Sequence, residues 1–208
     1  MTKALHTSPN RVLVVDNDAS QIAEYVACLG EDFEADNSTD TLTGLEKVFL
    51  GEETDVEHNP RFEVHSRNQG DTAVEAVQHA LERKQPFAAV ILELDLPPGI
   101  GGIETAQQIR ALDPYVNIVI VSGSSDANPE NLGKKIPPAD KVFFFRKPFH
   151  GVECRQLAAA PCGKWHADLA LRLANEDLER RVEERTAALQ KIAYFDIVTR
   201  LPNQLLLI

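Results

Sequence analysis

The chain lacks most of the features of a secreted or membrane-bound protein. Its 208 residues include only 3 cysteines, and Cys28, Cys154 and Cys162 do not have the spacing of zinc ligands, so we expect reduced thiols. The first ten residues contain no apolar stretch, which argues against a signal peptide. No apolar run approaches the roughly 20 residues that a transmembrane helix needs. The sequence therefore predicts a cytoplasmic protein without a membrane span.

Basic residues are also scarce. The chain has 21 Lys and Arg against 32 Asp and Glu, a formal net charge of −11. Binding to a nucleic acid needs clustered positive charge, so we do not expect a nucleic-acid partner. The 43% of hydrophobic residues is enough for a packed core. At this length the chain holds one ordinary domain with extra elements, or two small domains.

Short apolar runs alternate with segments of helical periodicity along most of the chain. Residues 11–15 (RVLVV) form a nearly continuous apolar run rich in β-branched residues, which is typical of a strand buried on both faces of a parallel sheet. Similar runs predict strands at 62–66, 87–92, 117–121 and 142–145, and the segments between and after them predict helices at 19–29, 71–84, 103–112, 129–135 and 152–160. This alternation predicts an α/β fold, a doubly wound five-stranded parallel sheet with helices on both faces.

Residues 30–60 interrupt the alternation, and we interpret them as an insertion between the first helix and the second strand. Within it, Asp40 could cap a short helix over residues 41–50.

The last third of the chain has a different pattern. Apolar and polar residues recur at alternating steps of four and three, as in the seam of a coiled coil: Leu171, Asn175, Leu178, Val182, Arg185, Leu189 and Ile192. An Asn at such a position favours two parallel strands. The alternative is an amphipathic helix packed on its own domain. We favour the coiled coil, because no further domain remains to cover the helix. Pro161 predicts a kink or break just before it.

Polar residues follow four of the five predicted strands. Asp16, Asn17 and Asp18 come after the first strand, Glu93 after the third, Ser122 after the fourth and Lys147 after the fifth. Carboxyl ends of parallel strands share one edge of the sheet, where sites in such folds lie beside the topological switch point. We therefore expect these side chains to gather there.

This set resembles the receiver domain of two-component response regulators, over roughly residues 11–160 and with the flavodoxin-like fold of that family. The resemblance implies that Asp16, Asn17 and Asp18 form an acidic pocket that could hold Mg²⁺, and that Glu93 stands where an Asp nucleophile accepts the phosphoryl group. Ser122 and Lys147 would contact the phosphoryl oxygens, and Phe144 would be the switch aromatic. The resemblance also implies a cis Lys147–Pro148 bond, and leaves open whether a histidine kinase is a partner.

The position of Glu93 depends on sequence register. Residues 93–105 (ELDLPPGIGGIET) resemble the DMRMPPGWDGIET-like segments of receivers attached to cyclic-di-GMP enzymes. The shared PPG and GIET place Glu93 on the phospho-acceptor. Asp95, the alternative, comes two residues too late.

Two departures from the family pattern predict that ordinary phosphotransfer fails. Glu93 is one methylene longer than Asp, which moves its carboxylate on the order of 1 Å, and such a displacement can cost ~100-fold in a positioned reaction. Asn17 removes a charged ligand from the Mg²⁺ site, so Mg²⁺ binding is doubtful. Either Glu93 pairs with Lys147 and holds the domain in one signalling state, or the domain is an inert dimerisation scaffold. Both hypotheses predict a contact between Glu93 and Lys147.

Residues 193–206 (AYFDIVTRLPNQLL) resemble the opening of diguanylate cyclase domains. We therefore expect a receiver domain at 1–160, a helical coiled-coil linker at 161–193 and the start of a cyclase domain at 194–208. The chain stops before any GGDEF or EAL signature, so we expect a non-enzymatic regulatory fragment. It would form a homodimer through the helix and control an output domain of the same protein, whether that domain makes or degrades cyclic-di-GMP.

Two alternatives remain. The VVDNDAS segment also fits the nucleophile motif of haloacid-dehalogenase-type phosphatases, with Asp16 as nucleophile and Asp18 as general acid, and with Ser122 and Lys147 as the next two motifs. That family needs a further acidic cluster after a later strand, whereas here only helix is predicted after Lys147. The other alternative is a stand-alone protein that recruits partners through its coiled coil.

Overall fold

The computed structural model describes residues 10–30, 61–123, 129–149 and 151–194, and the chain divides into two compact units, Met1–Trp165 and His166–Ile208. The helix predicted at 41–50 and the cyclase-like segment from residue 195 onward lie outside the described residues. Among the described helices, none is both long and apolar enough to cross a bilayer.

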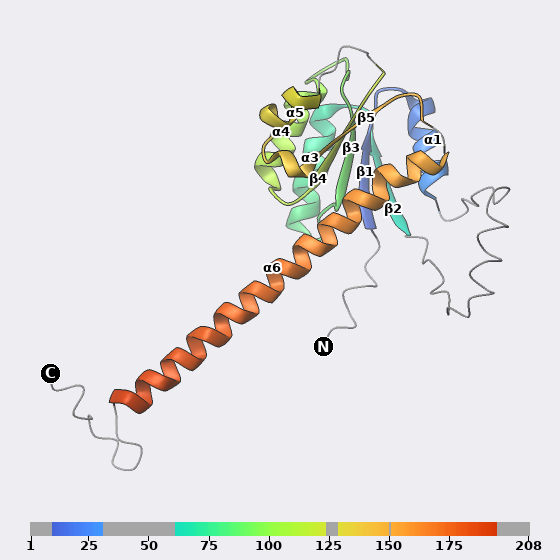
Figure 1. Cartoon of the computed structure of the whole chain (residues 1–208). Coiled ribbons are helices and arrows are strands. Elements are labelled where there is room, and N and C mark those ends of the chain that lie inside the picture. The colour runs from blue at the N-terminus through green and yellow to red at the C-terminus, as the bar shows by residue number, and fades with distance from the viewer. Residues whose placement is uncertain (1–9, 31–60, 124–128, 150, 195–208) are drawn as a thin grey trace, which may run out of the picture. The chain divides into compact units, whose positions relative to one another are not determined.

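The first unit contains a five-stranded parallel sheet with the strand order β2-β1-β3-β4-β5 (Figure 1). This is the doubly wound, flavodoxin-like order, whose switch point lies between β1 and β3. The predicted fold class is therefore confirmed. The strands are β1 (Asn10–Val15), β2 (Phe62–Arg67), β3 (Ala89–Glu93), β4 (Asn117–Ser122) and β5 (Val142–Arg146).

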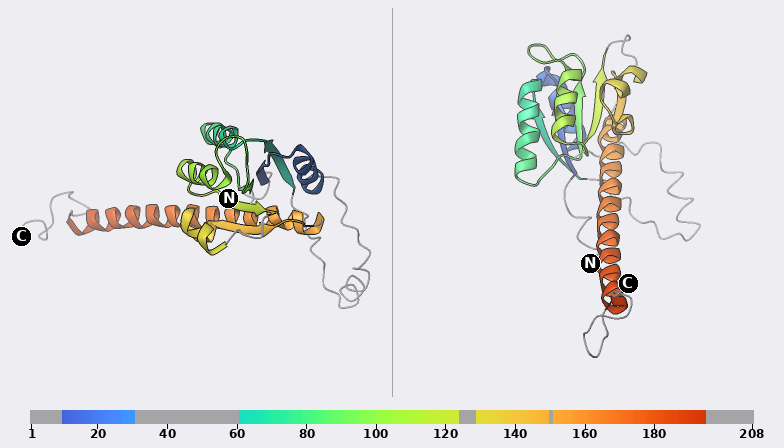
Figure 2. Two further views of the ribbon diagram at one scale, coloured as in Figure 1. Left: turned by 90° about the horizontal axis from the view of Figure 1, so that it is seen from above. Right: turned by 90° about the vertical axis from the view of Figure 1, so that its left-hand side faces the viewer.

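Helices cover both faces of the sheet, as Figures 1 and 2 show. One face packs against α3 (Gly70–Glu82), α4 (Gly102–Leu112) and α5 (Pro129–Lys135). The other packs against α1 (Ala19–Leu29) and the opening turns of α6 (Gly151–Tyr194). A short 3₁₀ turn, η1 (Ala139–Lys141), precedes β5. Because alternate residues of a strand point to opposite faces, each strand in the middle of the sheet is apolar on both sides.

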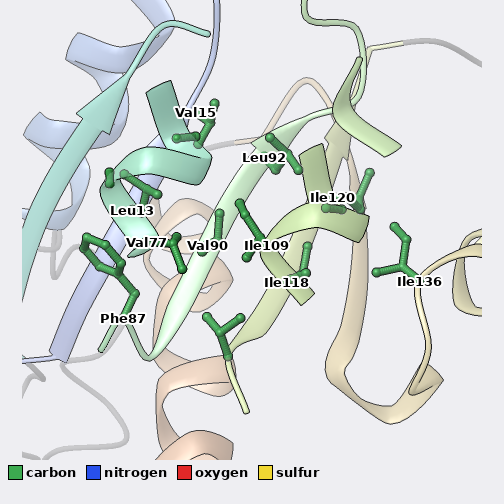
Figure 3. Packing of buried hydrophobic residues seen from close by; sticks show 14 of the residues in the cluster. Leu13, Val15, Val77, Phe87, Val90, Leu92, Ile109, Ile118, Ile120 and Ile136 are labelled. Atoms are coloured by element: carbon green, nitrogen blue, oxygen red, sulfur yellow. The ribbon is translucent and has the colours of Figure 1, made fainter. Parts of the chain in front are cut away.

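The core on the α3–α4–α5 face is a cluster of buried apolar side chains, many of them Val, Leu and Ile, shown in Figure 3. Leu92, Ile118 and Ile120 are completely buried at its centre, and Ile109 of α4 packs onto them. Each such side chain contributes about 1.5–3 kcal/mol by leaving water. The continuous apolar runs of β3 and β4 are thus explained, because every residue of both strands is buried.

Of the kink or break predicted at Pro161, the break is wrong, because α6 runs unbroken from Gly151 to Tyr194 with Pro161 inside it. Packing offsets the helical hydrogen bond that proline cannot make. The side-chain amide of Asn117 donates a 2.7 Å hydrogen bond to the Pro161 carbonyl, and Leu157 and Cys162 on either side are buried against the sheet. All three cysteines are free and buried, and burial raises the pKa of the Cys162 thiol to about 12.

Candidate functional site

Three of the predicted site residues, Asp16, Glu93 and Lys147, come together at the carboxyl edge of the sheet, at the ends of β1, β3 and β5, and Ser122 lies at the end of β4. Asp16 and Ser122 are 2% exposed and Glu93 is 8% exposed, so three polar side chains are buried at one edge. Buried polar groups of this kind need partners, since an unpaired buried carboxylate is strongly unfavourable.

Lys147 provides the partner for both buried carboxylates. Its ammonium nitrogen lies 2.7 Å from Oδ2 of Asp16 and 2.6 Å from Oε2 of Glu93. Burial alone would lower the pKa of Lys147, but the hydrogen bonds to Asp16 and Glu93 outweigh it and raise the pKa above its ordinary value. Lys147 therefore remains a cation at neutral pH, held between two anions.

Glu93 has both carboxylate oxygens occupied. Oε2 binds Lys147, and Oε1 accepts hydrogen bonds from the backbone N–H groups of Leu94 at 3.0 Å and Asp95 at 3.3 Å. The contact between Glu93 and Lys147 that the sequence predicts is thus present. Asp95, which the sequence offers as an alternative to Glu93 at the phospho-acceptor position, is exposed to solvent.

The three residues after β1 do not act as one group. Oδ1 of Asp16 accepts the backbone N–H of Asp18 at 2.9 Å, whereas the Asp18 side chain caps α1 by accepting the backbone N–H of Ser20 at 2.8 Å. A further hydrogen bond from the Ser20 hydroxyl is the main cause that lowers the pKa of Asp18. The amide of Asn17 donates to the carbonyl of Pro97 at 3.3 Å.

The side chains that could hold Mg²⁺ have other partners in this arrangement. The ion requires nearly octahedral oxygen ligands, but Asp16 and Glu93 are bound to Lys147 and Asp18 is bound to the start of α1. Within the described residues, no three or more His, Cys, Asp or Glu side chains are grouped as a metal site would need. The donors that the family uses for the ion are therefore present in part but have other partners.

Ser122 and Phe144 connect the site to the rest of the sheet. The Ser122 carbonyl accepts the backbone N–H of Lys147 at 2.9 Å, so the end of β4 fixes the start of the loop after β5. Phe144 of β5 is partly buried and packs against the cluster on the α3–α4–α5 face. The Lys147–Pro148 bond is cis, as the resemblance implied.

Gly102 is a site residue that sequence reasoning missed. A Cβ atom at this position would lie 2.4 Å from the carbonyl oxygen of Glu93 and 2.8 Å from the Leu94 backbone. Only glycine therefore allows α4 to begin so close to the end of β3. The Gly-Gly pair after the PPG segment was the available signal, since paired glycines often mark close backbone approach.

The second unit carries the seam residues on a single helix. The side chains of Leu171, Leu178, Val182 and Leu189 are each more than half exposed, while the side chain of Ile192 lies outside the described ones. Arg180 and Arg181 pair with Asp177 at 2.5 and 2.7 Å along the same helix. An apolar stripe of this length on an isolated helix is what a coiled coil would cover, and the coiled coil itself stays a prediction.

No family model and no curated protein matches the sequence. Solved structures do resemble it. The response regulator receiver domain protein (CheY-like) from Methanospirillum hungatei JF-1 is 14% identical with a TM-score of 0.53, and the match covers 77% of this chain and 99% of that one. The adenylate cyclase from Rhodopirellula baltica is 18% identical with a TM-score of 0.53, covering 83% and 98%.

A third similar structure is the N-terminal domain of a response regulator/sensory box/GGDEF 3-domain protein from Carboxydothermus hydrogenoformans. It is 12% identical with a TM-score of 0.51, and the match covers 76% of this chain and 98% of that one. At these identities the likeness shows the fold, which is that of CheY-like receiver domains.

Proposed function

We propose that this chain is a receiver module that is not phosphorylated in the ordinary way and that regulates a C-terminal output domain by dimerisation. The observation that carries the proposal is the ion pair of Lys147 with both Glu93 and Asp16 at the carboxyl edge of the sheet. In the family that the sequence resembles, this edge is where a phosphorylated Asp meets the same Lys.

The geometry supports Glu93 as a permanent charge in place of a transient one. Its carboxylate is buried, and Lys147 and two backbone N–H groups bind it. Charge-assisted hydrogen bonds of this kind are short and roughly twice as strong as neutral ones. Lys147 therefore has a negative partner on β3 without any phosphoryl transfer, and we propose that this holds the domain in one signalling state.

The same contacts argue against Glu93 as a nucleophile. An attacking carboxylate needs a free oxygen aligned with the phosphorus and an Mg²⁺ ion that offsets charge. Here both oxygens of Glu93 have partners, and the side chains that could hold the ion have other partners as well. A histidine kinase is accordingly not required for the proposed mechanism.

The exposed seam supports the output half of the proposal. Two copies of α6 would pair in parallel through Leu171, Leu178, Val182 and Leu189, with Asn175 fixing the register. The pair would set the spacing and rotation of two output domains. The cyclase-like residues 193–206 support an output domain that makes or degrades cyclic-di-GMP, and one of the similar structures is a domain of a GGDEF protein.

Acetyl phosphate with Mg²⁺, followed by intact-mass measurement, tests the proposal. We expect no phosphoryl adduct on the natural chain, because Glu93 is engaged and longer than Asp. The double variant Asn17→Asp/Glu93→Asp restores the family pattern and is the matched positive control, which we expect to gain one phosphoryl group. Asp95→Asn in both backgrounds excludes labelling at the neighbouring carboxylate.

Stoichiometric modification of the natural chain at Glu93 or Asp95 would overturn the proposal. Hydrolysis of a generic aryl phosphate with Mg²⁺, abolished by Asp16→Ala, would instead support the phosphatase alternative.

A further inference from the structure

A second polar site lies between the edge strand β2 and helix α3. It is a hollow of about 270 Å³, which we call the basic groove, and its lining includes Arg11, His65, Arg67, His79, Arg83 and Phe87. None of these residues belongs to the Glu93 site. The groove is formed by side chains from β1, β2, α3 and the segment that leads into β3.

The charge of the groove is opposite to that of the protein. Its lining contains three Arg and two His, and no described Asp or Glu, in a chain with a net charge of −11. A concave surface lined by one sign of charge focuses the field and concentrates ions of the other sign. The positive charge of the basic groove should therefore attract anions, although the chain as a whole is acidic.

The strand register places polar residues of β2 beside apolar residues of β1. In the parallel register, His65 pairs with Leu13 and Arg67 with Val15. Leu13 and Val15 belong to the apolar cluster beneath α3, whereas β2 is the edge strand of the sheet and carries polar side chains at the paired positions.

Several contacts hold the Arg11 side chain in the lining of the basic groove. Its guanidinium lies 3.1 Å from Oε1 of Glu63 and 3.1 Å from Nε2 of His65, donates to the Gln85 carbonyl, and lies 4.8 Å from the centroid of the Phe87 ring. The hydrogen bonds to Glu63 and Gln85 use two of the five N–H donors of an arginine. The guanidinium of Arg11 is therefore held in place, and it has further N–H groups that do not donate to any of the described residues.

Glu63 offsets Arg11 but not the other two arginines. The hydrogen bond with His65, helped by Arg11, outweighs burial and lowers the pKa of Glu63, so its carboxylate is ionised at neutral pH. Arg67 and Arg83 are exposed at the groove. Neither has a carboxylate partner within the described residues, although Arg67 donates to the Ser66 carbonyl at 2.6 Å. The excess positive charge of the groove therefore comes from Arg67 and Arg83.

We propose that the basic groove binds a small oxyanion of the phosphate class, either free or as a small phosphomonoester. Guanidinium groups bind such anions through paired N–H donors. The hollow of about 270 Å³ is large enough for a phosphate group, and the small side chains of Ala76 and Ala80 also line it.

Titration of the full-length ¹⁵N-labelled chain with inorganic phosphate, at constant ionic strength set by chloride, tests this proposal. We expect saturable shifts of the amide signals of His65, Arg67 and Arg83. The double variant Arg67→Gln/Arg83→Gln changes only exposed side chains, so it should fold, and we expect its affinity for phosphate to fall by about 10-fold or more, or roughly 1.4 kcal/mol.

Arg61→Gln is the matched control, because Arg61 is an exposed arginine just before β2 that does not line the groove. We expect this variant to bind phosphate like the natural chain. Equal affinity in the double variant, shifts located away from β2 and α3, or no saturable shift in the natural chain would each overturn the proposal. These results do not test the role of Glu93. Phosphate binding at the basic groove and the proposed function can therefore each be contradicted without the other.

Discussion

The Lys147 ammonium lies 2.6 Å from the Glu93 carboxylate, which joins the ends of β5 and β3 across β4, the strand between them. The same ammonium binds Asp16 at the end of β1 at 2.7 Å. One cation thus links three strand ends on both sides of the switch point. The charge balance of the site depends on it, because two carboxylates are buried around a single ammonium.

Removal of the Lys147 charge should destabilise the domain. Lys147→Met leaves Asp16 and Glu93 as uncompensated buried anions, and breaking a buried pair in this way costs about 3–5 kcal/mol. Urea unfolding measures the loss. Lys134→Met, on the exposed surface of α5, is the matched control and should change the free energy of unfolding by less than about 0.5 kcal/mol. If the two substitutions change the free energy of unfolding equally, the ion pair of Lys147 does not stabilise the domain.

Stability should also fall at alkaline pH in a way that depends on Lys147. Its pKa is raised in the folded state, so the unfolded chain loses this proton first, near pH 10.4. The contribution is complete below that pH and is lost as pH rises through the folded-state pKa, with a slope of at most ~1.4 kcal/mol per pH unit for one proton.

The free energy of unfolding should therefore decline more steeply in the natural chain than in Lys147→Met above about pH 10.4, measured from pH 9 to 12. Burial also raises the pKa of Tyr25, which adds a decline of the same sign, but Tyr25 is present in both proteins. Parallel curves for the two proteins would contradict the assigned role of Lys147.

The helix seam gives a prediction for oligomeric state. Leu178→Glu places a charge in the apolar stripe and should convert a dimer to a monomer in sedimentation velocity, because a coiled-coil core position is then charged in both copies. Leu173→Glu is the matched control, since Leu173 is an exposed leucine of the same helix outside the seam. If both variants stay dimeric, or if the natural chain is a monomer, the proposed pairing through α6 is wrong.

Much of the fold could be predicted because buried parallel strands have a simple signature. β3 and β4 are buried along their whole length, and residues 89–92 and 118–121 within them are apolar runs. The same strand ends then predict where Asp16, Glu93 and Lys147 meet. The break predicted at Pro161 does not occur, because the local rule that proline ends a helix takes no account of tertiary contacts. Here packing and the hydrogen bond from Asn117 stabilise the helix at this point.

Other features of the site depend on contacts that no local pattern contains. Asp18 belongs to the acidic segment after β1, but its side chain caps α1 instead of facing the pocket. The basic groove combines Arg11, His65 and Arg83 from three separate segments. Their proximity follows from the β1–β2 register and from the packing of α3, neither of which the residue types specify.

We propose that the charge of Glu93, acting through Lys147, sets the state of the whole domain. Comparison of the amide spectra of the natural chain and Glu93→Gln tests it most directly, because the substitution keeps the shape and removes the charge. We predict chemical-shift changes that extend beyond the site to Phe144 and to Leu132 on α5. Changes confined to residues that touch the side chain, such as Lys147, would show an inert scaffold and contradict the claim.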